Sequence, residues 1–335
     1  MTRRQLPPHP TATYVMRPWK AVYVSVPKAA CTSLKWLVAD LQGESEEHFA
    51  RSLSREVTRA MCIHRREMWQ HTPMLNELSH DELEAIAAEN GWFVYTVVRH
   101  PSARLFSGWQ SKFLLREPRW VHDFGHAPWF PRTPSRTEDV VEDFGAFVRE
   151  LDSRRDHPIL RDRHFMPQVE LIRADRVPYS RVYGTREIPQ LLQDLEAHLR
   201  SQGWEGQLRL RRSNETPLAP VEAVFPPDVR AAIERIYGKD FEAFGYDDVL
   251  PESLDPDGAY PERAFAEIER LVERGERIGD LALRAQELRR DKRRLRTKLA
   301  TRRGTPPPAP KPAKPGDGPG AKLKRAVRRV QRRFA

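Results

Sequence analysis

The sequence predicts an α/β protein with a mostly parallel sheet, and two strand-to-helix junctions carry that prediction. An apolar segment at 20–26 leads into a turn with Lys28 and then into an apolar-periodic segment at 32–42. A second apolar segment, the β-branched and aromatic run 92–98, is followed at once by Arg99 and a helix start. Such alternation of strand and helix is typical of α/β sheets, which bind ligands at the carboxyl ends of their strands.

The first junction has the composition of an anion site. Lys28 and the hydroxyls of Thr32 and Ser33 lie where a strand end meets a helix N-terminus, whose backbone N–H groups attract anions. The small pair Ala29 and Ala30 allows a close backbone turn. The loop differs from the common nucleotide-binding loop, which is glycine-rich and has its lysine late. A plain strand–helix junction with one exposed lysine is the alternative.

The second junction adds another cation. Arg99 ends the buried strand, and Pro101 suits the first turn of a helix. Arg104, Ser107 and Ser111 follow at i, i+3 and i+7, which places them on one helix face. A lysine at one junction and an arginine at the other predict two anionic groups on one ligand.

The remaining elements follow in order along the chain. A capping box of Ser79 and Glu82 predicts a helix over 79–90. Further helices are predicted at 102–116, 138–151, 187–201 and 226–238, with a short strand at 182–184. Residues 118–136 hold several Pro and Trp without periodicity, and we expect them to form a surface excursion over the active site.

Five segments together resemble the sulfotransferases, and more narrowly the carbohydrate sulfotransferases of the chondroitin and dermatan type with their bacterial relatives. Two resemble the cofactor signatures, Pro27-Lys28-x-x-Cys31-Thr32 and Arg99-x-Pro101-x-x-Arg104-Leu105-x-Ser107. The other three resemble further family segments, 162–168 with its His-aromatic-x-Pro-Gln pattern, 213–217, and 236–246. The resemblance implies a P-loop-like three-layer fold, a mostly parallel central sheet flanked by helices, over a domain at 19–250.

The resemblance also implies a co-substrate, 3′-phosphoadenosine 5′-phosphosulfate (PAPS), and a hydroxyl acceptor that is a carbohydrate. Arg99 and Ser107 would bind its 3′-phosphate. The first loop would bind its 5′-phosphosulfate through residues Pro27, Lys28, Ala29, Ala30, Cys31, Thr32 and Ser33. His100 departs from the family pattern and 114–160 matches it poorly, so the acceptor surface is not transferred.

The predicted catalytic residues are Lys28 and a histidine. Sulfuryl transfer needs in-line positioning and stabilisation of charge on the leaving oxygen, for which Lys28 is placed. A histidine is the usual general base near neutral pH. The resemblance implies one between the two cofactor motifs, which favours His64, with His71 as the alternative; we expect His164 to order the loop at 167–168. No His/Cys cluster has metal-ligand spacing, so no metal is predicted.

The cysteine count and the apolar content of the sequence indicate in which cellular compartment the protein works. The two cysteines, Cys31 and Cys62, do not make a disulfide framework and favour a reducing environment, and Cys31 is interpreted as a small packing residue of its loop. No apolar run approaches the ~20 residues that span a bilayer. Residues 1–18 are predicted to be a flexible lead without the apolar core of a secretory signal. We therefore expect a cytoplasmic protein.

The basic charge belongs to a C-terminal extension. Residues 289–335 hold eighteen of the 57 Lys and Arg but two of the 47 Asp and Glu, which leaves residues 1–288 with a net charge of −6. Residues 251–303 are predicted to form a long charged helix or weak coiled coil, with heptad spacing over 261–299 that would support a homo-oligomer. A Pro/Gly-rich linker is predicted at 304–320.

The last segment, 321–335, has basic residues around an apolar face, which is typical of a helix on an anionic membrane surface, here the inner face of the membrane. A solvated tail is the equal alternative. Nucleic acid is the least favoured partner, because no aromatic residues are interleaved for base stacking.

Two other function classes stay open. A nucleotide-dependent kinase or NTPase would need a late loop lysine and a magnesium-binding acid after a buried strand, where this chain has Arg99. A non-enzymatic binding protein working through its basic tail would leave residues 1–250 without nucleotide binding.

Overall fold

The computed structural model describes residues 10, 12–50, 59–211, 216–251, 254 and 258–302. The chain divides into two compact units, residues 1–279 and 280–335. The first unit contains the predicted domain and both junctions.

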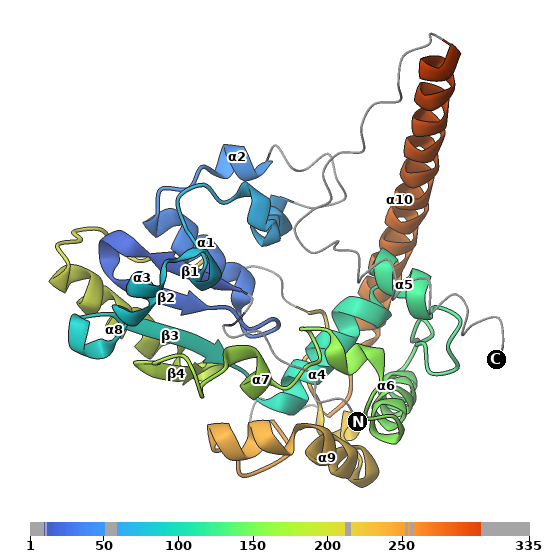
Figure 1. The fold of residues 1–335 in the computed structure, drawn as a ribbon. Coiled ribbons are helices and arrows are strands. Elements are labelled where there is room, and N and C mark those ends of the chain that lie inside the picture. Colours follow the sequence, from blue (N-terminus) through green and yellow to red (C-terminus); the bar gives the residue numbers. More distant parts are fainter. Residues whose placement is uncertain are drawn as a thin grey trace. The chain divides into compact units, whose positions relative to one another are not determined.

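A four-stranded sheet lies at the centre of the first unit. Its strands follow the order β1-β2-β3-β4, with β1 antiparallel to β2 and the other pairs parallel (Figure 1). The strands are β1 (Thr13–Met16), β2 (Ala21–Val24), β3 (Phe93–Val98) and β4 (Arg181–Gly184). Since the three parallel strands end at the same edge, Val24, Val98 and Gly184 deliver their following loops to one place. The predicted α/β class is confirmed.

Strand β1 departs from the predicted flexible lead over 1–18. Thr13–Met16 is buried along its whole length and pairs with β2 residue by residue. The Thr13 hydroxyl accepts a hydrogen bond from the Leu75 amide at 2.8 Å. A four-residue strand between prolines carries too little periodicity to be recognised, and neighbouring β2 supplies the order that the local sequence lacks.

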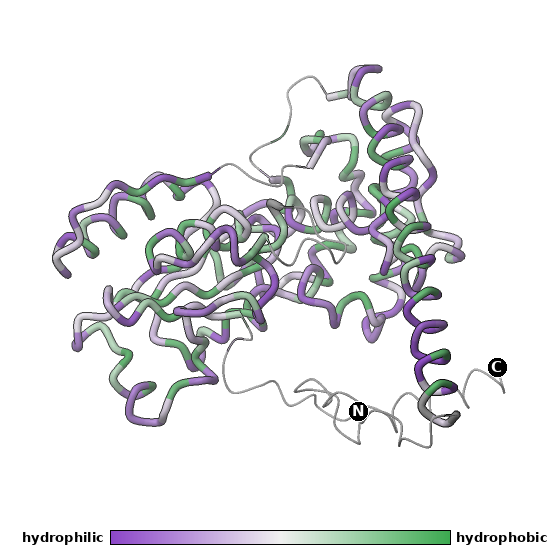
Figure 2. Tube along the Cα trace, turned by 90° about the horizontal axis from the view of Figure 1, so that it is seen from above, coloured by the Kyte–Doolittle hydropathy of each residue, from purple (hydrophilic) through white to green (hydrophobic). Residues whose placement is uncertain are grey.

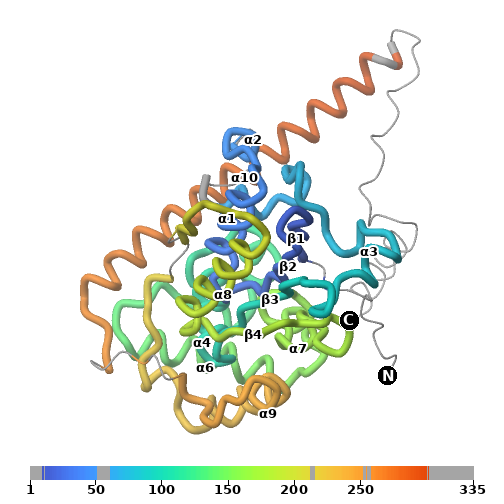
Figure 3. Tube along the Cα trace, turned by 90° about the vertical axis from the view of Figure 1, so that its left-hand side faces the viewer, coloured from blue at the N-terminus to red at the C-terminus, as the bar shows by residue number. Residues whose placement is uncertain are grey.

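Side chains alternate between the two faces of the sheet. Tyr23 and Tyr95 point into a core shared with α1 (Cys31–Leu41) and α8 (Ile188–Ser201). Val22 and Val94 point to the other face, where residues near α3 (His80–Glu84) cover them. Figure 3 shows α1 and α8 on one side of the strands and α3 on the other. This is the three-layer arrangement that the resemblance implied. The capping box of Ser79 and Glu82 opens α3 as predicted, but the helix ends at Glu84 and does not continue to residue 90.

A second core is built from helices beyond the end of β3. Its elements are α4 (Pro101–Trp109), a π-helical turn (Gln110–Leu114), α5 (Pro118–Phe124), α6 (Thr137–Ser153), α9 (Pro227–Phe244) and the first turns of α10 (Glu262–Arg302). The predicted surface excursion at 118–136 is wrong in part. Trp120 and Trp129 are buried against Phe113, so this segment contributes aromatic rings to the core.

Short elements complete the described chain. These are the helices α2 (Glu46–Ala50) and α7 (Gln168–Ile172) and the 3-10 turns Arg17–Trp19, Arg59–His64, Arg66–Met68, Leu75–Glu77, Ala88–Asn90, Pro158–Arg161, Thr185–Glu187 and Glu222–Val224. Among the described residues, no helix has the length and apolarity to cross a membrane.

The part of α10 in the second unit is hydrophilic with isolated apolar residues, as Figure 2 shows toward its C-terminal end. Leu281, Leu288 and Leu295 recur at seven-residue spacing and are each at least 60% exposed. Whether they meet a second copy of the chain stays a prediction. The segments 304–320 and 321–335 lie outside the described residues.

Candidate active site

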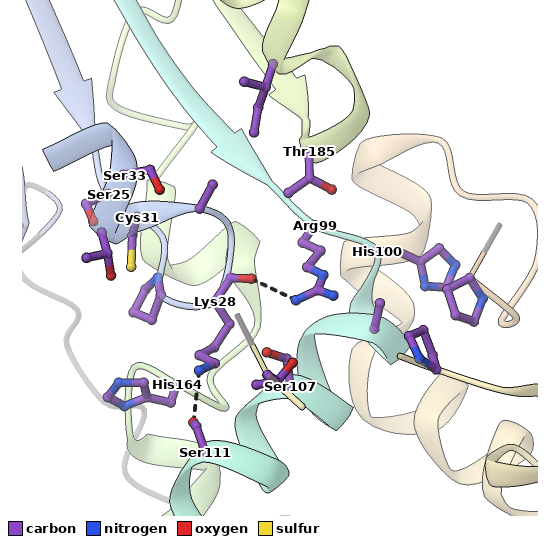
Figure 4. A pocket seen from close by; sticks show the side chains of 18 of the residues that line it. Ser25, Lys28, Cys31, Ser33, Arg99, His100, Ser107, Ser111, His164 and Thr185 are labelled. Carbon is purple, nitrogen blue, oxygen red and sulfur yellow. Dashed lines mark hydrogen bonds between the residues drawn. The ribbon is translucent and has the colours of Figure 1, made fainter. Parts of the chain in front are cut away.

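A pocket of about 1350 Å³ opens where β2 and β3 end. Both predicted junctions line it (Figure 4). The predicted site residues on its wall are Pro27, Lys28, Ala30, Cys31, Thr32, Ser33, His64, Arg99 and Ser107. Ala29 lies behind the wall, fully buried in the core. His71 is exposed and does not line the pocket.

The loop after β2 holds an unusual backbone conformation. Lys28 and Ala30 have φ values of 70° and 53°, a left-handed region that L-residues rarely adopt. Helix α1 begins at Cys31, and its first hydrogen bond closes from the Leu34 amide to the Ala30 carbonyl at 3.1 Å. The amides of the first turn therefore have no intrahelical partner. Strained backbone next to exposed amides is typical of a ligand-binding turn.

Lys28 is partly buried and has no counter-charge among the described residues. Its ammonium donates a hydrogen bond to the Ser111 hydroxyl at 2.9 Å and forms no ion pair with any described carboxylate. Burial, together with the charge of Lys112, lowers the pKa of Lys28 to about 8. Because a buried ammonium is costly unless it is paired, this arrangement favours an anionic ligand.

Arg99 is a second, partly buried cation at the end of β3. Its guanidinium donates to the Lys28 carbonyl at 3.3 Å, which links the two junctions directly. Burial, followed by the charge of Arg104, lowers its pKa. No described carboxylate pairs with it either. The two junctions thus place two cations on the wall of one pocket. That they bind two anionic groups of one ligand stays a prediction.

The backbone of Arg99 is held by Gln168. The Gln168 side-chain oxygen accepts from the Arg99 amide at 2.9 Å, and its amide nitrogen donates to the Arg99 carbonyl at 2.8 Å. Asp240 in turn accepts from the amides of Gln168 and Val169 at 2.8 and 3.0 Å. Two of the segments that resemble the family, 162–168 and 236–246, therefore position Arg99, which belongs to another such segment.

We expect Gln168→Ala to lower the free energy of unfolding by about 2–4 kcal/mol, because both backbone groups of Arg99 lose a buried partner. Denaturant unfolding measures the change. The matched control is Gln190→Ala, since Gln190 is exposed and makes one surface hydrogen bond. Equal stability of the two variants would contradict the role given to Gln168.

Arg104 is a buried crosslink, although its motif suggested a ligand contact. It is 1% exposed and does not line the pocket. Its guanidinium donates to the carbonyls of Pro27, Met166 and Arg163 at 3.1, 2.9 and 2.8 Å. It ties the Lys28 loop to the 163–166 loop.

His64 lies on the pocket wall with both ring nitrogens engaged. Its Nε2 is 3.0 Å from the Thr32 hydroxyl and its Nδ1 is 3.0 Å from the Lys35 ammonium. An ammonium only donates, so Nδ1 accepts and Nε2 donates its hydrogen to Thr32. Burial, followed by the Lys35 charge, lowers the pKa of His64 to about 2. His64 has no lone pair left for a substrate proton in this arrangement.

Three groups on the wall were not predicted as site residues. Ser111 partners Lys28 from the π-helical turn, where the Leu115 amide bonds five residues back to the Gln110 carbonyl at 2.9 Å. Lys112 forms an ion pair with Glu117. His164 pairs with Asp162. The sequence spacing had placed Ser111 on the same helix face as Arg104 and Ser107. For His164, the signal available in the sequence was Asp162, an acidic residue two positions earlier.

The fold and the site together define a class. A three-layer α/β fold that presents two partly buried cations without described carboxylate partners at adjacent strand ends is an anion-binding fold of the P-loop-like type. The chain belongs to the sulfotransferase family, whose family model matches residues 13–247. This confirms the resemblance at the level of the family. No curated protein and no solved structure matches the chain. A sulfotransferase domain supports a transferase that moves a sulfuryl group.

Proposed function

We propose that this protein transfers the sulfuryl group of PAPS to a hydroxyl group of a carbohydrate acceptor. The observation that carries the proposal is the pair of partly buried cations, Lys28 and Arg99, which share one pocket and have no carboxylate partner among the described residues. PAPS is a ligand with two separated anionic groups. The carbohydrate class of the acceptor rests on the resemblance in sequence.

The residues present fit this co-substrate. Lys28 and the first-turn amides of α1 would hold the phosphosulfate, and Arg99 with Ser107 would hold the 3′-phosphate. PAPS supplies an activated sulfuryl group. Lys28 would stabilise the charge that grows on the leaving phosphate oxygen. The proposal assigns no role to a metal ion.

Retention on immobilised 3′,5′-ADP tests the proposal, because this nucleotide is the product that PAPS leaves behind. We expect the full chain to be retained, and Lys28→Ala and Arg99→Ala to elute early. Arg176→Ala is the control, since Arg176 is exposed and outside the pocket. Failure of the wild-type chain to bind would overturn the proposal, and preference for ATP with magnesium would favour a kinase. A mass gain of one SO₃ group on cell-envelope glycans would identify the acceptor.

Binding of 3′,5′-ADP is expected to weaken as the pH rises through about 8. The charged form of Lys28 binds the anion, and its pKa is lowered to about 8, so the ammonium is lost over this range. Titration calorimetry between about pH 7 and pH 9 measures the effect. Lys28→Arg stays charged throughout and should show a flatter profile, and a wild-type profile equally flat would contradict the prediction.

The partner and compartment predictions are carried here as proposals. We propose a homo-oligomer through the heptad positions of 261–299, an anionic membrane surface for 321–335, and a cytoplasmic location. Sedimentation of the full chain, alone and with vesicles rich in anionic lipid, tests the first two.

A further inference from the structure

His164, on the pocket wall, forms a carboxylate–imidazole pair with Asp162. The Nδ1 atom of His164 is 2.6 Å from the Asp162 carboxylate, which also accepts from the His164 amide at 3.0 Å. Although burial acts in the opposite direction, the hydrogen bonds from His164 lower the pKa of Asp162 to about 2. The carboxylate is therefore ionised at neutral pH and fixes the imidazole hydrogen on Nδ1.

The other ring nitrogen has no described partner. No described residue hydrogen-bonds the Nε2 atom of His164, and the side chain is 32% exposed while it lines the pocket. Figure 4 shows His164 among the labelled pocket residues, near the end of the Lys28 side chain and its partner Ser111.

The backbone around His164 is locked in place. A Cβ atom added at Gly108 would come within 2.9 Å of the Phe165 ring and 3.5 Å of the His164 carbonyl, so this loop packs closely on α4. Phe165 is fully buried, and Arg104 holds the carbonyls of Arg163 and Met166 on either side. Positioned imidazoles of this kind suit proton transfer, because little reorganisation is needed.

The contrast with His64 separates the two histidines. His64 donates from Nε2 and accepts at Nδ1, whereas His164 donates from Nδ1 and keeps a lone pair on Nε2. A general base needs a lone pair facing the substrate. The geometry therefore favours His164, which the sequence had assigned to ordering a loop.

We propose that His164 is the general base of the sulfuryl transfer and that Asp162 is its positioning residue. The inference rests on the proposed function. In the step, the acceptor oxygen forms a bond to sulfur while the bond from sulfur to the bridging phosphate oxygen breaks. The acceptor proton moves to Nε2 of His164, and the leaving 3′,5′-ADP takes the electron pair beside Lys28. His164 then releases the proton to solvent.

The electrostatic surroundings keep His164 neutral before reaction. Burial, acting against the hydrogen bond that His164 donates to Asp162, lowers the pKa of His164 to about 4, and the charges of Lys112 and Lys28 act in the same direction as burial. An anionic co-substrate beside these two lysines would offset their charge. The base would thus gain proton affinity when the nucleotide is bound.

Diethylpyrocarbonate, which acylates imidazole nitrogens that carry a lone pair, tests the assignment without an acceptor. On the full chain near neutral pH, we expect mass spectrometry of peptides to find His164 modified and His64 unmodified. The exposed His122 reports the ordinary reactivity of a histidine. Modification of His64 with His164 left intact would overturn the proposal.

Kinetics provides the second arm. With water or an added carbohydrate as acceptor, His164→Ala should slow the conversion of PAPS to 3′,5′-ADP by about 10²–10⁴-fold, with unchanged affinity for 3′,5′-ADP. Added imidazole should restore part of the rate. Asp162→Asn should reduce kcat more than KM and change the pH profile, because the imidazole hydrogen is no longer fixed by a charge.

The outcomes separate the two proposals. His122→Ala, on the exposed surface of α5, is the control and should match the wild type. If the wild-type chain fails to bind 3′,5′-ADP, the proposed function falls. If it binds, and His164→Ala turns over within threefold of the wild type or gains nothing from imidazole, only the assignment of the base falls.

Discussion

Replacing Lys28 by alanine is expected to reduce sulfuryl transfer by about 10³-fold. The ammonium lies beside the amides of the α1 N-terminus and is held by Ser111. Among the described residues of this loop, no other cationic side chain could stabilise the charge that develops on the leaving oxygen. The rate of 3′,5′-ADP release from PAPS measures the loss, and a decrease below tenfold would contradict the role of Lys28.

Lys28→Gly provides a comparison that separates chemistry from backbone strain. Lys28 has a φ of 70°, which glycine adopts without penalty and alanine does not. We expect Lys28→Gly to be as inactive as Lys28→Ala but more stable by about 1 kcal/mol, measured by thermal unfolding. Equal stability of the two variants would mean that the loop relaxes once the side chain is removed.

Replacing Arg104 by methionine is expected to lower the free energy of unfolding by about 3 kcal/mol. Three buried carbonyls would lose their donor at a cost of roughly 1–3 kcal/mol each, partly offset because a buried charge disappears. The same change would release the loops that carry Lys28 and His164. We therefore expect weaker binding of 3′,5′-ADP in the same variant, although Arg104 does not line the pocket.

The control for Arg104 is Arg149→Met. Arg149 pairs with Asp228 at 3.0 Å, with both side chains more than half exposed. Such surface pairs contribute about 0–1 kcal/mol. Denaturant unfolding of both variants measures the difference. If Arg104→Met were no less stable than Arg149→Met, the three carbonyls would have found other partners, and the crosslink would not be needed for stability.

The sheet and the two junctions could be predicted because their signals are local. A buried strand such as 92–98 is a continuous apolar run, and the cation that follows it marks the strand end. Strand β1 was missed because it has four residues and depends on β2 for its order. The burial of Trp120 and Trp129 was missed for a similar reason, since ring partners such as Phe113, Phe147 and Phe165 come from other segments of the chain.

The two cations of the site could be predicted from the sequence, but the hydrogen bonds that position them could not. Lys28 and Arg99 follow from motif spacing, whereas the roles of Gln168 and Arg104 depend on contacts across 60 or more residues. The same holds for the base. His64 has the expected position in the chain, but its nitrogens are occupied by Thr32 and Lys35, which only the three-dimensional arrangement reveals.

The π-helical turn after α4 has a consequence for how this segment tolerates insertions and deletions. Gln110 forms hydrogen bonds with the backbone of Leu218, and Ser111 accepts a hydrogen bond from Lys28. Phe113 packs in the aromatic core, so residues of this one turn contact three different parts of the protein. Removing one residue there would restore a regular helix and rotate everything after it by about 100° relative to everything before. The segment could then keep the contact of Ser111 with Lys28 or the packing of Phe113 in the aromatic core, but not both. Substitutions should be tolerated here far better than any change in length.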